Sequence, residues 1–180
     1  IENYYMYVTP SIYKPGALKA FKLGGNSNFG ASTDVGFGFK YEADNGFAVA
    51  SNIVDKNADS TGFFQNDSVS KWDTQFAYTQ PRYHLSLTLS NAQGWTSQLY
   101  NATALGENTA DDSMGYAARA YWMPEESGTA VPEISVGYDV KVWDDAANGA
   151  VDEAASWMIG LTWKDIMRAD DRIGIALSQP

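Results

Sequence analysis

The chain has 180 residues and no cysteine, and 44% of its residues are hydrophobic and 14% aromatic. This composition is typical of a folded domain rich in β-structure, and the absence of cysteine excludes disulfide bonds and thiolate metal sites. The net charge of −10 argues against a nucleic-acid partner. No run of about 18 apolar residues occurs, so a transmembrane helix is excluded, whereas a barrel of half-apolar transmembrane strands is not.

Residues 1–9 are predicted to form a strand, and the opening IENYYMYV has neither an initiator Met nor a signal peptide, so we expect a processed or partial chain. Residues 10–32 do not alternate cleanly, because prolines and a Gly-Gly pair interrupt them. From 33 to 42, aromatic and branched side chains alternate with small or charged ones, which is the strand period. Asn45-Gly46 then predicts a tight hairpin turn, because both residues tolerate positive φ, and a return strand over 47–53.

The same alternation recurs along the rest of the chain. One set of positions carries large apolar side chains, and the other carries Gly, Ser, Thr or charged residues. The further strands that this pattern predicts are 73–78, 83–90, 116–122, 133–142, 156–163 and 172–178. With residues 1–9 they make about nine antiparallel strands.

The connections between these strands differ in length. Those at 43–46 and 80–82 are short, those at 123–132 and 164–171 are intermediate, and those at 55–72, 91–112 and 143–154 are long and polar. Bacterial outer-membrane barrels have tight periplasmic turns and long external loops. Aromatic residues also fall near both strand ends, as at membrane interfaces: Tyr41, Phe47, Tyr78, Tyr83, Trp122 and Trp163 at the short-turn end, and Trp72, Trp143 and Trp157 near the long-loop end. The sequence therefore favours an antiparallel transmembrane β-barrel over a soluble β protein.

In such a barrel the small and charged side chains face a water-filled interior. The residues that we predict to line it are Asp34, Lys40, Glu42, Asp73, Arg82, His84, Arg119, Glu133, Asp139, Lys141 and Arg172. Residues 10–32 have two interpretations, an inward constriction loop with Lys14, Lys19 and Lys22 facing the passage, or a plain external loop or additional hairpin. Both charge signs occur in the lining, so the ion preference is not predictable from it.

Two segments carry a resemblance to a known family: YWMPEESGTAVPEISVGY at 121–138 and WMIGLTWKDIMRADDRIGIALSQP at 157–180. They closely resemble the cyanobacterial outer-membrane porins, many of which are described as iron uptake porins and which are related to the carbohydrate-selective porins. Residues 6–32 are similar to the segment that leads into that family's inward loop.

The resemblance implies a barrel of sixteen antiparallel strands that assembles as a homotrimer in outer-membrane lipid. It also implies a signal peptide and a domain that binds the cell wall, both before the barrel. Residues 1–180 would then form part of one barrel domain, without the wall-binding domain and the remaining strands.

Catalytic and metal-binding interpretations have little support in the sequence. His84, the only histidine, shares a strand face with Ser86 and Ser90, but neighbours on one strand do not form a shaped oxyanion site. The pairs Asp111-Asp112, Asp144-Asp145 and Asp170-Asp171 could offer oxygen ligands, although no loop has the ligand spacing of a calcium loop. We therefore predict no enzyme activity, no cofactor and no metal.

The leading hypothesis is a porin for passive diffusion of inorganic ions and small hydrophilic solutes, without a ligand cluster that would support iron as its cargo. The alternative is a soluble or surface-attached β-sandwich that binds carbohydrate through stacked aromatic rings. A sandwich would bury Phe37, Leu87, Val136 and Ile159 in a dry core, whereas a porin would expose them to lipid.

Overall fold

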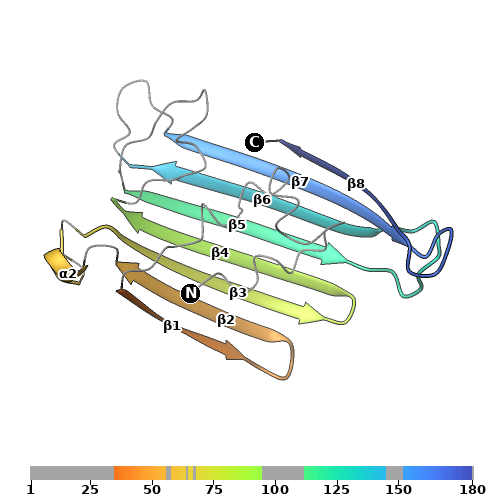
Figure 1. Cartoon of the computed structure of the whole chain (residues 1–180), viewed down its shortest axis with the longest axis horizontal. Coiled ribbons are helices and arrows are strands. Elements are labelled where there is room, and N and C mark those ends of the chain that lie inside the picture. Colours follow the sequence, from red (N-terminus) through yellow and green to blue (C-terminus); the bar gives the residue numbers. More distant parts are fainter. Residues whose placement is uncertain are drawn as a thin grey trace.

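A computed structural model describes residues 35–55, 58–63, 65–66, 68–94, 112–144 and 152–179. They form one antiparallel sheet of eight strands, in which each strand is hydrogen-bonded to the next along the chain (Figure 1). The strands are β1 Val35–Glu42, β2 Phe47–Asp55, β3 Ser70–Gln80, β4 Tyr83–Gln93, β5 Ser113–Trp122, β6 Glu133–Trp143, β7 Glu153–Lys164 and β8 Arg172–Gln179. A single helical turn, α2 at Ala58–Thr61, follows β2.

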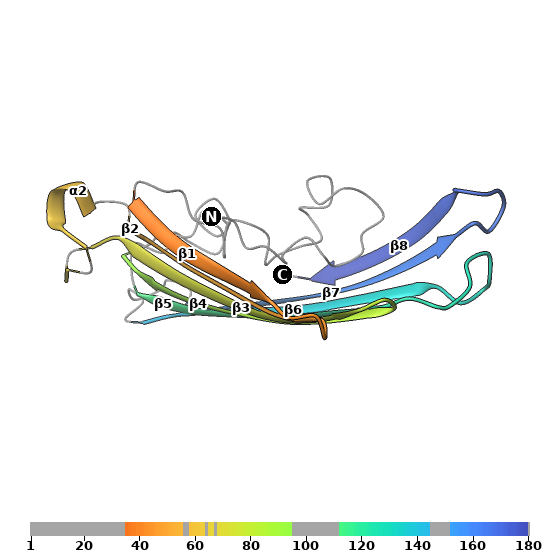
Figure 2. The ribbon, with the colours of Figure 1, turned by 90° about the horizontal axis from the view of Figure 1, so that it is seen from below.

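The predicted all-β antiparallel class is confirmed, as are the eight strands predicted after residue 32. The strand predicted at residues 1–9 lies outside the described residues. In the described part of the chain the sheet is open, with β1 and β8 as its two edge strands. Seen from the side the sheet is bent into an arc, with β1 and β8 rising toward the same side (Figure 2).

The turn between β1 and β2 is formed where the sequence predicts it, but with a different conformation. Gly46 has a φ of 90°, whereas Asn45 does not adopt positive φ. Asn45 instead accepts a hydrogen bond from the Phe47 N–H through its side-chain oxygen, at 3.0 Å. The turn therefore places only its glycine in the left-handed region, where other residues are strained.

The connections alternate between the two ends of the sheet. Residues 43–46, 81–82, 123–132 and 165–171 join strands at the short-turn end, which lies at the right of Figure 1. Residues 56–69, 94–112 and 144–152 join them at the other, long-loop end. The predicted asymmetry therefore holds for 56–69 and 94–112 but not for 144–152, which has nine residues where 123–132 at the other end has ten.

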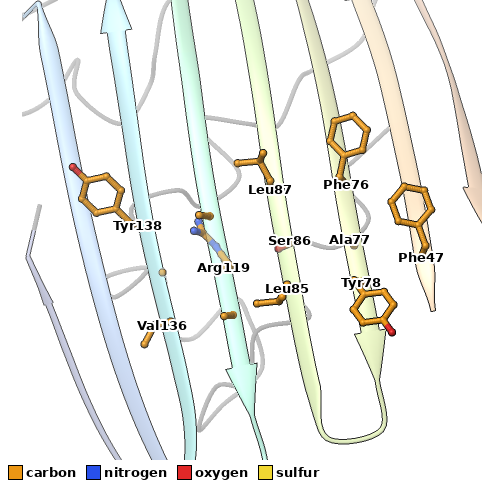
Figure 3. A pocket seen from close by; sticks show the side chains of 13 residues that line it. Phe47, Phe76, Ala77, Tyr78, Leu85, Ser86, Leu87, Arg119, Val136 and Tyr138 are labelled. Atoms are coloured by element: carbon orange, nitrogen blue, oxygen red, sulfur yellow. The ribbon is translucent and has the colours of Figure 1, made fainter. Parts of the chain in front are cut away.

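The two faces of the sheet have opposite chemistry, and the apolar one is exposed. Phe37, Leu87, Val136 and Ile159 are 62%, 43%, 40% and 43% exposed. The other face buries polar side chains, and its buried apolar residues in the described ranges are mostly alanine: Ala48, Ala77, Ala92 and Ala117, with Val54, Trp143 and Met158. Figures 2 and 3 together place the large apolar side chains on the convex face. The polar side chains therefore lie on the concave face.

Candidate functional site

The concave face gathers most of the charged residues that the sequence predicts to line a pore. Alternation places them at every second position, because side chains of a strand point to one face with a period of two. The predicted lining residues that are buried on this face are Asp73, His84, Arg119, Glu133, Asp139 and Lys141. These six residues therefore share one face of the sheet.

The register of the strands aligns some of these residues across the sheet. One row runs from Asn52 of β2 through Asp73, Ser90 and Gly115 to Lys141 of β6, each residue paired with the next. Neighbouring strands lie about 4.8 Å apart. The backbones of Asp73 and Lys141, which are three strands apart, are therefore separated by about 14 Å across the sheet. The two residues between them, Ser90 and Gly115, have a short side chain or none, and both are buried.

Arg119 of β5 and Asp139 of β6 form a two-point ion pair on this face. The guanidinium Nη1 and Nη2 donate to the carboxylate Oδ1 and Oδ2 respectively, and the Nη2 to Oδ2 distance is 2.9 Å. Gly137 is the register partner of Arg119, and a Cβ there would lie 3.3 Å from Nη1 and 2.9 Å from the Met158 Cγ. Because Gly137 has no Cβ, the Arg119 guanidinium can lie beside it and reach Asp139.

A second charged group lies toward the long-loop end. The Lys71 Nζ is 3.9 Å from the Asp73 Oδ2, and both side chains are buried. The Lys141 Nζ lies over the Trp143 ring, 5.3 Å from its centroid, which is a cation–π geometry.

His84 is held in the wall by its neighbours. Its Nδ1 lies 2.8 Å from the Thr79 Oγ1, and its ring stacks on Tyr121 with centroids 5.5 Å apart. Both contacts fix the plane of the imidazole on the concave face. Neither contact supplies the serine nucleophile that a hydrolase would need.

Three more of the predicted lining residues lie on the same face by register but are exposed on the edge strands. Lys40 and Glu42 of β1 form an ion pair at 2.8 Å, and Arg172 begins β8. Arg82, also predicted to line the pore, lies in the β3–β4 turn, where it donates to the Met123 carbonyl and the Glu125 carboxylate. The remaining predicted residues, Asp34, Lys14, Lys19 and Lys22, lie outside the described residues, as does all of 10–32.

Two residues of the concave face were misassigned or missed by the sequence reasoning. Lys71 was assigned to a loop, although it lies two positions before Asp73 and so has the same strand parity. Trp143 was predicted near a membrane interface, but it is 4% exposed on the concave face. The sequence did contain the information needed to place Trp143. The even-numbered residues of β6 face the convex side, so Trp143, like Lys141, must face the concave side.

The short-turn end is braced by hydrogen bonds between its connections. The Asp171 carboxylate accepts the backbone N–H groups of residues 166, 167 and 168 at 2.9–3.0 Å. Hydrogen bonds from the Ser127 hydroxyl and the Asp170 N–H hold the pKa of Asp165 below its ordinary value of 3.8. These acids therefore shape the turn, which supports a structural role for the Asp170-Asp171 pair.

The convex face has a shallow depression of about 480 Å³ over β5 (Figure 3). Ala118 and Ala120 form its base, and larger residues such as Leu85, Leu87 and Tyr138 rise on either side. Nearby, the Trp72 Nε1 donates to the Ser51 Oγ at 2.8 Å, so this exposed indole has its polar atom satisfied. The convex face consequently presents almost only apolar atoms.

In the described ranges, no three His, Asp and Glu side chains are close enough together to hold a metal ion. No helix in these ranges has the length and apolarity needed to span a membrane. No protein-family model, curated protein or solved structure matches the chain.

Proposed function

We propose that this chain forms part of an outer-membrane β-barrel that acts as a porin, through which inorganic ions and small hydrophilic solutes diffuse passively. The observation that carries the proposal is the inverted burial of the sheet. Large apolar side chains cover the exposed convex face, and charged side chains fill the buried concave face. In a barrel, lipid would cover the apolar convex face, and water would solvate the charged side chains of the concave face.

Each face of the sheet is stable only in the solvent that its side chains require. Burying a Leu, Val, Ile or Phe side chain contributes about 1.5–3 kcal/mol, and a soluble sheet gains this by covering its apolar face. Here that face lies open over all eight strands, including Phe39, Trp72, Leu85, Tyr138 and Leu177. Contiguous apolar surface of this extent indicates contact with a membrane or a partner.

The strand lengths fit a bilayer. Strands β3, β4 and β6 have 11 residues each. At about 3.4 Å per residue and a tilt near 45°, an 11-residue strand spans about 26 Å along the membrane normal. The apolar band of outer-membrane barrels is about 25 Å tall.

The carbohydrate-binding sandwich is the less favoured function. It requires Phe37, Leu87, Val136 and Ile159 to pack in a dry core, and all four are exposed. It also requires a second sheet on the apolar face, and the described residues form a single sheet. The aromatic rings of the convex face are therefore better suited to lipid than to a core.

Single-channel recording of the full-length protein in a planar bilayer tests the proposal. We expect stepwise, ohmic current increments that need neither cofactor nor energy source. Protein that stays in solution without detergent and leaves the bilayer silent would instead favour the sandwich. A trimeric assembly, which the sequence resemblance implies, would give increments in groups of three.

A further inference from the structure

The large side chains of the convex face leave a groove over β5. Its base is formed by Ala118 and Ala120. Larger side chains flank each alanine in the register: Leu85 and Val136 beside Ala120, and Leu87 and Tyr138 beside Ala118 (Figure 3). The flanking strands β4 and β6 are two strand spacings apart, which is about 10 Å. This alanine groove is therefore one strand wide and runs along β5.

Aromatic side chains close both ends of the alanine groove. Side chains on one face recur at every second residue, so the next ones along β5 are Tyr116 toward the long-loop end and Trp122 toward the short-turn end. Trp122 is paired with Tyr83 of β4, whose ring centroid lies 6.0 Å from that of Tyr78. Three exposed aromatic rings thus gather at the short-turn end, as amphipathic rings do at the interface between a membrane and water.

A cationic group lies at the same end of the groove. The Arg82 guanidinium carbon is 5.7 Å from the centroid of the Trp122 ring. Its Nε donates to the Met123 carbonyl at 3.1 Å, and its Nη1 donates to the Glu125 carboxylate at 3.2 Å. These contacts position the guanidinium over the end of the groove. The Arg82 and Glu125 side chains are both exposed, so their ion pair contributes little stability and another anion can compete for Arg82.

A lipid molecule has the chemistry that fits both parts of this surface. Inside a bilayer no hydrophobic driving force favours one apolar contact over another, so van der Waals fit and polar contacts decide which molecule stays bound. The groove offers such contacts to an acyl chain from its base and from both walls. Arg82 offers a planar fork of donors that matches the oxygens of a phosphate group. A second copy fits less well, because two convex faces meet along a narrow line (Figure 2).

We propose that the alanine groove and Arg82 form a binding site for one glycerophospholipid of the periplasmic leaflet. One acyl chain lies in the groove, and the phosphate is bound by the Arg82 guanidinium at the short-turn end. The inference rests on the proposed function, because only a lipid-facing convex surface meets such a molecule. Glu125 limits the affinity, since its carboxylate competes with the phosphate for Arg82.

Native mass spectrometry of the full-length protein in detergent tests the site by titration with two lipids. Dimyristoylphosphatidylglycerol has the phosphate, and dimyristoylglycerol has the same acyl chains without it. We expect saturable binding of one phosphatidylglycerol per subunit. Arg82→Gln should weaken that binding about fivefold, the upper range for an exposed ion pair, and leave dimyristoylglycerol binding unchanged. Glu125→Gln should strengthen phosphatidylglycerol binding.

A second variant tests the groove by itself. Ala118→Phe places a ring on the groove base and should weaken the binding of both lipids several-fold. Its matched control is Ile175→Phe, which adds a ring at an exposed position of the same face on β8. Arg168→Gln, in the exposed β7–β8 connection, is the matched control for Arg82→Gln. Both controls should leave lipid binding unchanged.

The outcomes separate the lipid site from the porin proposal. Equal effects of Arg82→Gln and Arg168→Gln, or of Ala118→Phe and Ile175→Phe, would overturn the lipid site, while stepwise current from the same preparation in a planar bilayer would leave the porin proposal intact. Dissociation of an oligomer by Ala118→Phe with lipid binding unchanged would show that the groove is a contact between copies, and would also overturn the site. A silent bilayer together with no bound lipid would overturn both proposals.

Discussion

The substitution Leu87→Lys distinguishes a lipid-facing convex surface from a water-facing one. Leu87 lies next to the centre of the 11-residue strand β4 and is 43% exposed. If the convex face meets water, replacing an exposed leucine with lysine changes the free energy of unfolding by no more than about 0.5 kcal/mol. If it meets hydrocarbon near the bilayer midplane, the same change costs about 2–4 kcal/mol. That cost is a shift of about 30- to 900-fold in the folding equilibrium.

The assay is urea-dependent folding of the full-length protein into phosphatidylcholine vesicles, followed by the fluorescence of its tryptophans. Tyr83→Lys is the depth control, because Tyr83 is exposed on the same face at the short-turn end of β4. Lysine near an interface costs only about 0–1 kcal/mol. A Leu87→Lys effect no larger than that of Tyr83→Lys would refute a lipid-facing convex surface.

Further predictions concern the turn, the acid response and the buried ion pair. Gly46→Ala should destabilise the protein by about 1–3 kcal/mol, because φ is 90° there and a Cβ would meet a carbonyl oxygen of β3 at 2.1 Å. Gly62→Ala should cost less in the same urea titration, since its φ is also positive but its nearest contact is 3.6 Å away. The lowered pKa of Asp165 means that its stabilising effect is complete above its ordinary value of 3.8 and is lost as the pH falls through the lower folded value. Asp165→Asn should therefore flatten the stability profile below that pH, and an unchanged acid profile would contradict this role. Arg119→Gln should cost about 3 kcal/mol because it leaves the Asp139 carboxylate buried without its partner. Adding Asp139→Asn should recover most of that loss, and strictly additive losses in the double variant would rule out the coupling.

Much of the fold could be predicted from the sequence because strand alternation is a local property. Phe76, Leu87 and Val136 share a parity with the other large residues of their strands, and backbone geometry then places them on one face. Gly46, which tolerates positive φ, and Pro81, whose ring fixes φ, mark two of the hairpin turns by their own dihedral preferences. Element boundaries were less predictable, which is why Lys71, at the beginning of β3, was assigned to a loop.

The arrangement of the candidate site depends on the pairing register of the strands. Alternation along one strand does not determine that register where a long connection separates two strands. The 19-residue step from Gln93 to Ser113 gives no local signal for which residue of β5 meets Ser90. Only the paired sheet brings Lys141 into the row of Asp73 and shows that Arg119 reaches Asp139.

The sequence by itself determined the strand period, the turn positions and the chemistry of each face, since these follow from residue type and nearest neighbours along the chain. The tertiary structure decided which charges meet, where Trp143 and Arg82 lie, and that the apolar face is the exposed one. Those outcomes depend on hydrogen bonding between strands far apart in sequence and on the curvature of the whole sheet, and neither is encoded in any single segment.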